Sequence, residues 1–243
     1  YNTMRGELIP FGYFLTEVQT EGEPVDFRQS LDPRCGLVKS ECVYQDGSRV
    51  SAETFCCLHR NVVVLKRRWE APEGRVFRLR YFFNPKYAEL NWNGNGAIDY
   101  SIDGIRIFQG RIQFESDVPF SFRREEDAFV WSTESREFVL MLRFDDAGPL
   151  PSADELLEQS RREWNKYWSE GFVKVPSEKL QWMYDLAQYH LRISSTAWGM
   201  PTGIYASHWH SRFFAFDEYF MFMGLATSGH LETAARIPAF RHS

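Results

Sequence analysis

The chain has 243 residues, of which 44% are hydrophobic and 25% charged, a composition typical of a globular protein with a substantial core. This composition excludes disorder, collagen and coiled coil, and no stretch approaches the ~18 uncharged apolar residues of a membrane-spanning helix. The net charge of −5 argues against nucleic acid or an anionic membrane surface as the partner. The length allows one large domain, or one domain and part of a second.

The first 150 residues are predicted to form an antiparallel β-sandwich. Short segments rich in β-branched and aromatic residues follow one another without a helical pattern between them. The Asp-Gly pairs Asp46-Gly47 and Asp103-Gly104 mark two hairpins. Residues 91–96 are expected to be a plain connection, with a binding loop as the alternative. The predicted strands are 8–18, 36–44, 50–59, 62–69, 76–83, 98–102, 105–114, 129–132 and 138–144.

The four cysteines are Cys35, Cys42, Cys56 and Cys57. We expect free thiols, with the alternative of one disulfide between Cys35 or Cys42 and one of the adjacent pair. Neighbours in a strand point to opposite faces, so Cys56 and Cys57 should differ in exposure. No Cys-x-x-Cys or histidine spacing indicates zinc. The first residues do not resemble a signal peptide, but a signal could have been removed, so cytoplasmic and periplasmic or secreted locations both stay open.

Helices are predicted to begin after a break at residues 148–151. Ser152 and Glu155 form a capping-box pattern, and that helix should end near Gly171. Ser177 begins a second helix, and further helices are expected at 212–227 and 231–241. We therefore divide the chain into a β-sandwich (1–150), a linker helix (151–175) and a helical region (176–243). The buried stripe expected on the second helix comprises Leu180, Tyr184, Ala187, Leu191 and Ser194.

Aromatic residues concentrate at 198–222, where they account for nine of 25 positions. Sugar rings present flat C–H faces, so aromatic rings beside carboxylates are what a sugar pocket requires. We interpret Tyr205 and Trp209 as pocket-lining residues and the phenylalanines as core residues. His208, His210 and Arg212 alternate and could hydrogen-bond a sugar from one face. Two histidines alone are a weak metal signal, so neither a metal nor a cofactor is expected.

Asp217 and Glu218 are the carboxylates within this aromatic stretch. As helix neighbours their side chains diverge by about 100°, so they cannot act as an acid–base pair across one sugar. We interpret Asp217 as an acceptor for sugar hydroxyls. Glu218 is a second candidate for substrate binding, although a stabilising role at the positive end of the helix is preferred for it. His190 and His230 are interpreted as structural.

Several segments together resemble the six-hairpin glycosidase superfamily. They are 160–168 (SRREWNKYW), 173–176 (VKVP), 180–189, 201–205 (PTGIY) and 208–220. The resemblance implies an N-terminal β-supersandwich joined by a linker helix to an (α/α)6 barrel. The segment 213–220 (FFAFDEYF) is similar to the family's aromatic-Asp-x-Glu segment, whose aspartate touches the sugar in the −1 position. This assigns Asp217 to that sugar, although Asp217 and Glu218 are adjacent here.

The resemblance implies a glycoside hydrolase of the inverting type, acting on an oligo- or polysaccharide of plant or microbial origin. The chain corresponds to the sandwich, the linker and the first barrel helices, so the general acid is expected beyond Ser243. The alternatives are a disaccharide phosphorylase, a non-catalytic carbohydrate-binding protein and an interaction domain. An exposed barrel edge would associate with the remaining barrel segment or with itself. The candidate substrate-binding residues are Asp217, Glu218, Trp209, His210, Tyr205 and Arg212.

Overall fold

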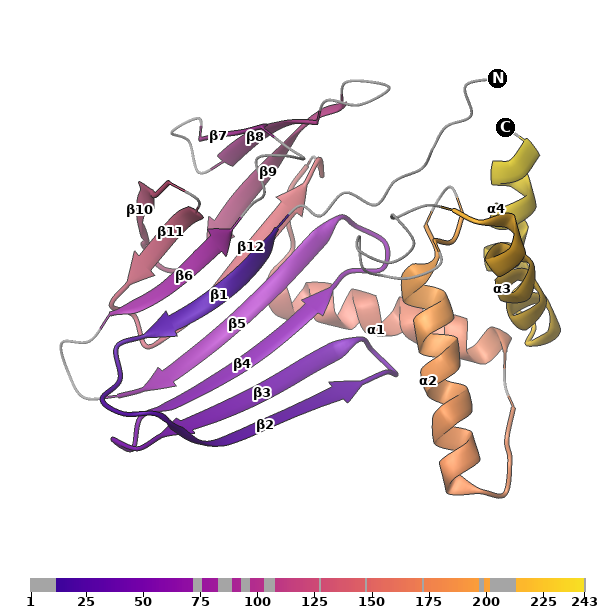
Figure 1. The fold of residues 1–243 in the computed structure, drawn as a ribbon, viewed down its shortest axis with the longest axis horizontal. Coiled ribbons are helices and arrows are strands. Elements are labelled where there is room, and N and C mark those ends of the chain that lie inside the picture. The colour runs from indigo at the N-terminus through magenta and orange to yellow at the C-terminus, as the bar shows by residue number, and fades with distance from the viewer. Residues whose placement is uncertain are drawn as a thin grey trace. The chain divides into compact units, whose positions relative to one another are not determined.

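The computed structural model describes residues 12–71, 76–82, 89–92, 97–102, 108–126, 128–146, 148–171, 173–196, 199–201 and 213–242. These residues form twelve strands followed by four helices, so the predicted order of a β-sandwich and then a helical region is confirmed (Figure 1). The chain divides into two compact units, and the division falls inside the first helix, between Arg162 and Glu163.

The sandwich unit contains two sheets in which every strand pairing is antiparallel. One sheet has four strands in the order β1-β6-β11-β10, and the other has eight in the order β2-β3-β4-β5-β12-β9-β8-β7. The strands are β1 (Tyr13–Val18), β2 (Pro24–Asp32), β3 (Leu37–Tyr44), β4 (Arg49–Cys56), β5 (Val62–Glu70), β6 (Phe77–Phe82), β7 (Glu89–Trp92), β8 (Ala97–Ile102), β9 (Phe108–Ser116), β10 (Ser121–Arg124), β11 (Ala128–Thr133) and β12 (Glu137–Phe144).

The core of the sandwich lies between the two sheets. Alternate residues of β6 are buried, including Phe77 and Leu79, as expected for a strand with one face in the core. On the opposing sheet, Phe138 and Leu140 of β12 are each 1% exposed. The rings of Phe77 and Phe138 meet edge to face with centroids 4.9 Å apart, so this contact joins the two layers.

Three strands escape the sequence prediction. Every residue of the edge strand β2 is exposed, and the polar run from Arg28 to Ser30 interrupts the alternation of its apolar residues Val25, Phe27 and Leu31. The strands β7 and β10 have only four residues each. Residues 91 and 92, expected in a connection, end β7, whereas 93–96 and the predicted turn at Asp103-Gly104 lie outside the described residues. The hairpin at Asp46-Gly47 is confirmed between β3 and β4, and Gly47 has φ +81°.

All four cysteines are free thiols. Cys56 is exposed and Cys57 is buried, which confirms that the two neighbours face opposite sides. The alternative of one disulfide is therefore wrong for this structure.

The helix α1 (Ala153–Glu170) begins at the predicted capping box. The Glu155 carboxylate accepts from the Ser152 backbone N–H at 2.9 Å, and the Glu155 backbone N–H donates to Ser152 Oγ at 3.3 Å. Lys66 of β5 forms an ion pair with Asp154 in the first turn of the helix. The start of α1 is thereby attached to the eight-stranded sheet.

Arg143 at the end of β12 holds the chain as it leaves the sandwich. Its guanidinium lies 2.6 Å from the Glu115 carboxylate and donates to the backbone carbonyls of Asp146 and Gly148 at 2.7 and 2.5 Å. Arg60 forms an ion pair with Asp146, which holds the pKa of that carboxyl below its usual range. The path from β12 into α1 is therefore fixed by charged hydrogen bonds.

The helical unit contains the end of α1 and the helices α2 (Glu178–Ser194), α3 (Ala215–Thr227) and α4 (Leu231–His242). The predicted stripe on α2 is wrong in part, because Leu180 is 57% exposed and Ala187 is also exposed. Instead Gln188 and Tyr189 are buried. They contact the end of α1, where the Tyr189 ring stacks on Trp164 with centroids 5.3 Å apart. A periodic pattern identifies the helix but does not decide which face its neighbour covers.

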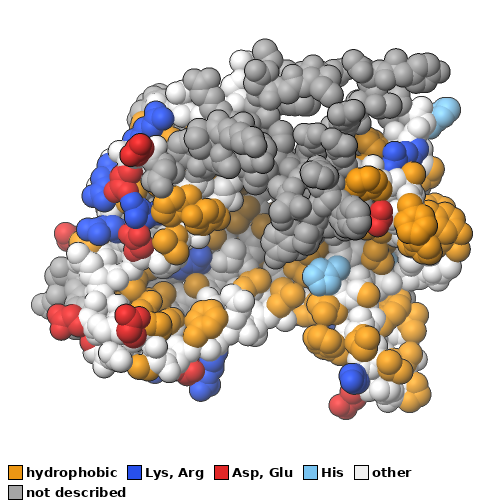
Figure 2. All heavy atoms as spheres, in the orientation of Figure 1, with side chains coloured by type: hydrophobic (Ala, Val, Ile, Leu, Met, Phe, Trp, Pro, Cys, Tyr) orange, Lys and Arg blue, Asp and Glu red, His pale blue; other side chains and the backbone are white. Residues whose placement is uncertain are grey.

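Large apolar side chains are exposed on α2 and α3, where Figure 2 shows hydrophobic side chains gathered. On α3, Phe216 is 74% and Phe220 is 58% exposed, so the expectation that the phenylalanines fill the core is wrong for these two. No helix among the described residues is long and apolar enough to cross a membrane. The exposed residues are Leu180, Trp182, Met183 and Ile193 on α2, and Phe216, Tyr219, Phe220 and Met223 on α3.

Candidate functional site

The two carboxylates of the aromatic stretch lie in the first turn of α3 and face different surroundings. Asp217 is partly exposed, whereas Glu218 is 1% exposed. The divergence expected for helix neighbours is thus observed, and only Asp217 is open to a ligand from solvent.

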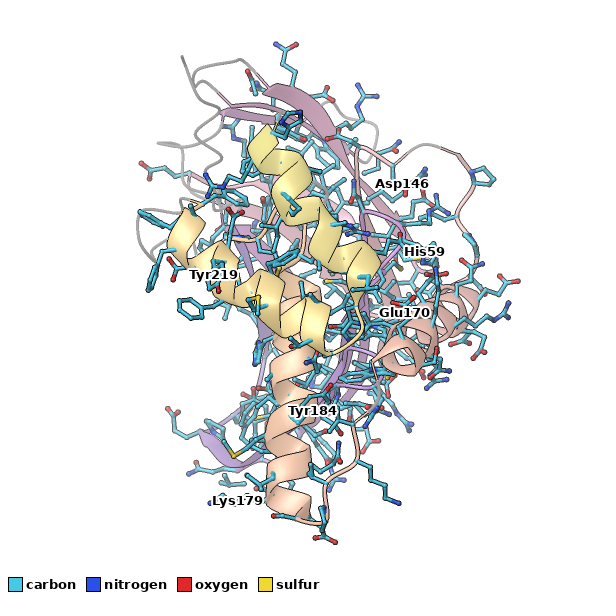
Figure 3. The ribbon with its side chains drawn as sticks, turned by 90° about the vertical axis from the view of Figure 1, so that its right-hand side faces the viewer. His59, Asp146, Glu170, Lys179, Tyr184 and Tyr219 are labelled. Atoms are coloured by element: carbon cyan, nitrogen blue, oxygen red, sulfur yellow. The ribbon has the colours of Figure 1, made fainter. Side chains whose placement is uncertain are left out.

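Aromatic residues with exposed rings precede and follow Asp217 in the sequence of α3. Tyr219 is 57% exposed and projects from the helix in Figure 3. The rings of Phe216 and Phe220 meet edge to face at 5.1 Å, and those of Tyr219 and Phe220 at 5.3 Å. A carboxylate accepts hydrogen bonds from hydroxyl groups, and aromatic faces cover the C–H faces of a sugar ring. The first turn of α3 therefore carries both kinds of group that carbohydrate recognition uses.

The Glu218 carboxylate is bound on both oxygens by the protein itself. Arg241 of α4 donates to Oε2 from Nε at 2.6 Å and lies 2.5 Å from it through Nη2. The backbone N–H of Met200 donates to Oε1 at 3.3 Å. These contacts favour a structural role for Glu218 over direct contact with a sugar. Neither partner could be foreseen, because no local pattern links Glu218 to positions 18 and 23 residues away.

Tyr205, Trp209, His210 and Arg212 lie outside the described residues, as does His208. Their assignment to the pocket remains a prediction. The described chain resumes at Phe213, four residues before Asp217.

Residues 199–201, which precede the undescribed stretch, pack into the helical unit. Met200 is 1% exposed and packs with Leu225, Ala234 and Ile237. Thr196 donates from its hydroxyl to the Gly199 carbonyl at 2.8 Å, and the Gly199 N–H returns a hydrogen bond of 3.0 Å to that hydroxyl. This segment is therefore held on both its polar and its apolar side.

A buried polar cluster lies where the end of α1 meets α2 and the turn between α3 and α4. His230 is fully buried, and its ring stacks on Tyr167 with centroids 3.8 Å apart and planes 5° apart. Desolvation lowers the pKa of His230, against the opposing effect of Glu170, whose carboxylate lies 3.7 Å from Nδ1. The Tyr167 hydroxyl donates to the Gln188 carbonyl at 3.0 Å. Figure 3 labels Glu170 and also Tyr184 of α2.

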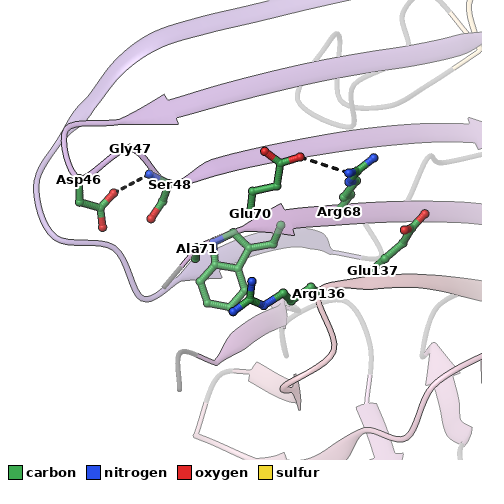
Figure 4. Close-up of a pocket in the computed structure, with 9 residues that line it drawn as sticks. Asp46, Gly47, Ser48, Arg68, Glu70, Ala71, Arg136 and Glu137 are labelled. Carbon is green, nitrogen blue, oxygen red and sulfur yellow. Dashed lines mark hydrogen bonds and ion pairs between the residues drawn. The ribbon is translucent and has the colours of Figure 1, made fainter. Parts of the chain in front are cut away.

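Charged residues line two of the hollows that the described part of the sandwich forms. The one in Figure 4 has a volume of about 590 Å³, and there Arg68 pairs with Glu70 at 3.3 Å. Its Asp46 carboxylate accepts from the backbone N–H groups of Ser48 and Glu21. The other hollow, about 870 Å³, lies over β2 to β5 and β12, and its Lys39 pairs with Glu53 at 2.7 Å. No cluster of His, Cys, Asp or Glu suited to a metal ion occurs within the described part of the chain.

Three comparisons with known proteins were informative only at the level of the fold. No family model matches the sequence, and no curated protein matches it. A solved structure, a bacterial glucoamylase complexed with acarbose, matches with a TM-score of 0.55 at 13% identity. The match covers 92% of this chain and 43% of that chain, so this chain spans less than half the length of the glucoamylase. At this identity the match shows the fold alone, a β-sandwich followed by helices as in that glucoamylase.

Proposed function

We propose that the chain is part of a glycoside hydrolase and that α3 contributes Asp217 to its sugar pocket. The observation that carries this proposal is the partly exposed Asp217 carboxylate on the helix face that it shares with the exposed ring of Phe220, three residues further on, in a chain with the fold of a glucoamylase region. In this role Asp217 accepts hydrogen bonds from hydroxyls of the sugar in the −1 position. Tyr205 and Trp209 supply stacking surfaces, while His210 and Arg212 supply polar contacts.

The proposed reaction is inverting hydrolysis of an oligo- or polysaccharide. Such a reaction needs a general acid and a general base whose carboxyl groups lie about 6.5–9.5 Å apart, with water between them. Glu218 does not suit either role, because Arg241 and Met200 occupy its oxygens. The general acid of the proposed reaction is therefore a residue other than Glu218.

A non-catalytic carbohydrate-binding protein is the second candidate. It is favoured because the Glu218 carboxylate is bound to Arg241, so Asp217 has no catalytic partner in its sequence neighbour. Binding would need only Asp217 and the aromatic rings. A disaccharide phosphorylase is a variant of the enzyme proposal in which inorganic phosphate replaces water.

The exposed apolar faces of α2 and α3 support a further part of the proposal, namely association with additional helices or with a second copy. Trp182 is 62% exposed and Met183 is 52% exposed, and apolar patches of this kind are covered in stable assemblies. Association through these faces would remove the side chains from water.

The test measures binding of acarbose, maltotriose and cellotriose by the encoded protein, and turnover of the two trisaccharides. Release of reducing sugar without phosphate supports the hydrolase, and release only with phosphate supports the phosphorylase. Binding without release supports the non-catalytic candidate. Asp217→Asn should abolish binding or turnover while the far-ultraviolet circular dichroism stays unchanged. The matched control is Glu232→Gln, since the Glu232 side chain is 74% exposed on α4. An Asp217→Asn protein as active as wild type would remove Asp217 from the pocket.

A further inference from the structure

Glu218 is a buried carboxylate whose hydrogen-bond partners come from two other segments of the helical unit. A buried carboxylate is costly unless charged or hydrogen-bonding partners compensate it. Glu218 has both, because Arg241 comes from α4 and the Met200 N–H from the segment 199–201. One side chain of α3 therefore binds two other parts of the helical unit through charge-assisted hydrogen bonds.

Gly199 lets the backbone approach this carboxylate closely. A Cβ atom at this position would lie 2.9 Å from Glu218 Oε1 and 3.1 Å from Cδ1 of Phe240. The rings of Phe213 and Phe240 meet with centroids 5.2 Å apart, and the Arg241 guanidinium lies 5.7 Å from the Phe240 ring. A side chain at position 199 would therefore press against both the Glu218 carboxylate and the Phe240 ring, so the close approach requires glycine.

The start of α3 depends on this contact. The N-cap residue Phe214 makes no side-chain capping hydrogen bond, so the first turn lacks the usual protection of a helix N-terminus. Glu218 binds from within that turn. Because Asp217 is its direct neighbour, fixing the Glu218 side chain fixes the direction in which the Asp217 side chain leaves the helix.

We infer that Glu218 is a positioning residue, which joins α3 to α4 and to residues 199–201 and so orients Asp217 toward its ligand. The orientation of a ligand-binding Asp217 rests on the proposed function, whereas the joining of the three segments does not. Arg241 and Gly199 are the other two members of this clamp.

The first test is amide hydrogen exchange of the encoded protein, read at Met200 and in the peptide covering 213–218. Glu218→Ala removes both sets of hydrogen bonds and should accelerate exchange at Met200 about tenfold or more. Glu218→Gln keeps an oxygen for Met200 but loses the charge that Arg241 binds, so Met200 should stay protected while the end of α4 exchanges faster. Glu232→Gln, also on α4, is the matched control and should change neither. Unchanged exchange at Met200 in Glu218→Ala would overturn the clamp.

The second test is the affinity for maltotriose and cellotriose, measured by calorimetry on the same variants. Glu218→Ala should weaken binding about tenfold, and Glu218→Gln should restore part of it. Asp217→Asn should lose binding without any change in exchange at Met200. Wild-type affinity in a Glu218→Ala protein whose Met200 exchanges faster would overturn the positioning role. If wild-type protein binds neither sugar, the proposed function fails for these ligands, and the exchange data alone support or overturn the clamp.

Discussion

Replacing Gly171 with alanine should destabilise the helical unit, although alanine is ordinarily the smallest possible change. Gly171 directly follows α1, and a Cβ there would lie 2.3 Å from the backbone carbonyl oxygen of Ser228. It would also lie 2.5 Å from Nε2 and 2.8 Å from Cε1 of His230. The carbonyl belongs to the backbone, and the buried His230 ring is stacked on Tyr167, so neither can move aside freely.

The expected magnitude follows from the cost of overpacking, about 1–3 kcal/mol in the free energy of unfolding. For a protein of this size, each kcal/mol corresponds to roughly 2–4 °C in Tm. Gly224→Ala is the matched control within α3. Among the described residues its Cβ would meet only Leu191 Cδ1, at an ordinary 3.5 Å, and replacing glycine in a helix interior should stabilise by about 0.5–1 kcal/mol.

The assay is urea denaturation followed by circular dichroism at a helix-sensitive wavelength, with both variants measured beside wild type. The same chemical change should shift the denaturation midpoint down at Gly171 and up at Gly224. Equal midpoints for Gly171→Ala and wild type would refute the close packing of the α1 end against the turn between α3 and α4.

Two further predictions concern buried charges. The pKa of His230 in the folded protein is lowered below the ordinary 6.5. As the pH falls, the unfolded chain therefore binds a proton at this residue before the folded protein does. The residue thus costs no stability above pH 6.5, and the folded protein loses stability as the pH falls below that value. In urea titrations the free energy of unfolding of wild type, relative to that of His230→Asn, should therefore be lower at about pH 5 than at about pH 8. The same difference in free energy at both pH values would contradict the burial of a neutral ring. The second prediction concerns the sandwich: Arg143→Met removes the ion pair with Glu115 and two hydrogen bonds to backbone carbonyls, so the free energy of unfolding should fall by about 1–3 kcal/mol. Glu115→Gln should cost less, because that side chain is 41% exposed, and equal losses would show that the two carbonyl contacts contribute nothing.

The sequence predicts those parts of the fold that local chemistry determines. The capping box at Ser152 and the Asp46-Gly47 hairpin form as expected, since each depends on residues close together in the chain. The strand β2 is missed because the polar run from Arg28 to Ser30 interrupts the alternation of its apolar residues Val25, Phe27 and Leu31. The buried face of α2 is assigned incorrectly, since a Tyr189–Trp164 contact across 25 residues decides it.

The candidate site divides in the same way. The divergence of Asp217 and Glu218 follows from helix geometry and is predictable. The burial of Glu218 is not, because it requires Arg241 from another helix and an N–H from residue 200. Long-range pairs of this kind leave no periodic pattern in a single sequence.

The role of Asp217 in sugar binding is tested most directly by a calorimetric titration of wild type and Asp217→Asn with acarbose, maltotriose and cellotriose. Wild type should bind at least one of these sugars saturably, and Asp217→Asn should lose at least tenfold in affinity, because a charged hydrogen-bond acceptor is removed. Wild-type affinity in the Asp217→Asn protein would contradict the claim that this carboxylate binds the sugar.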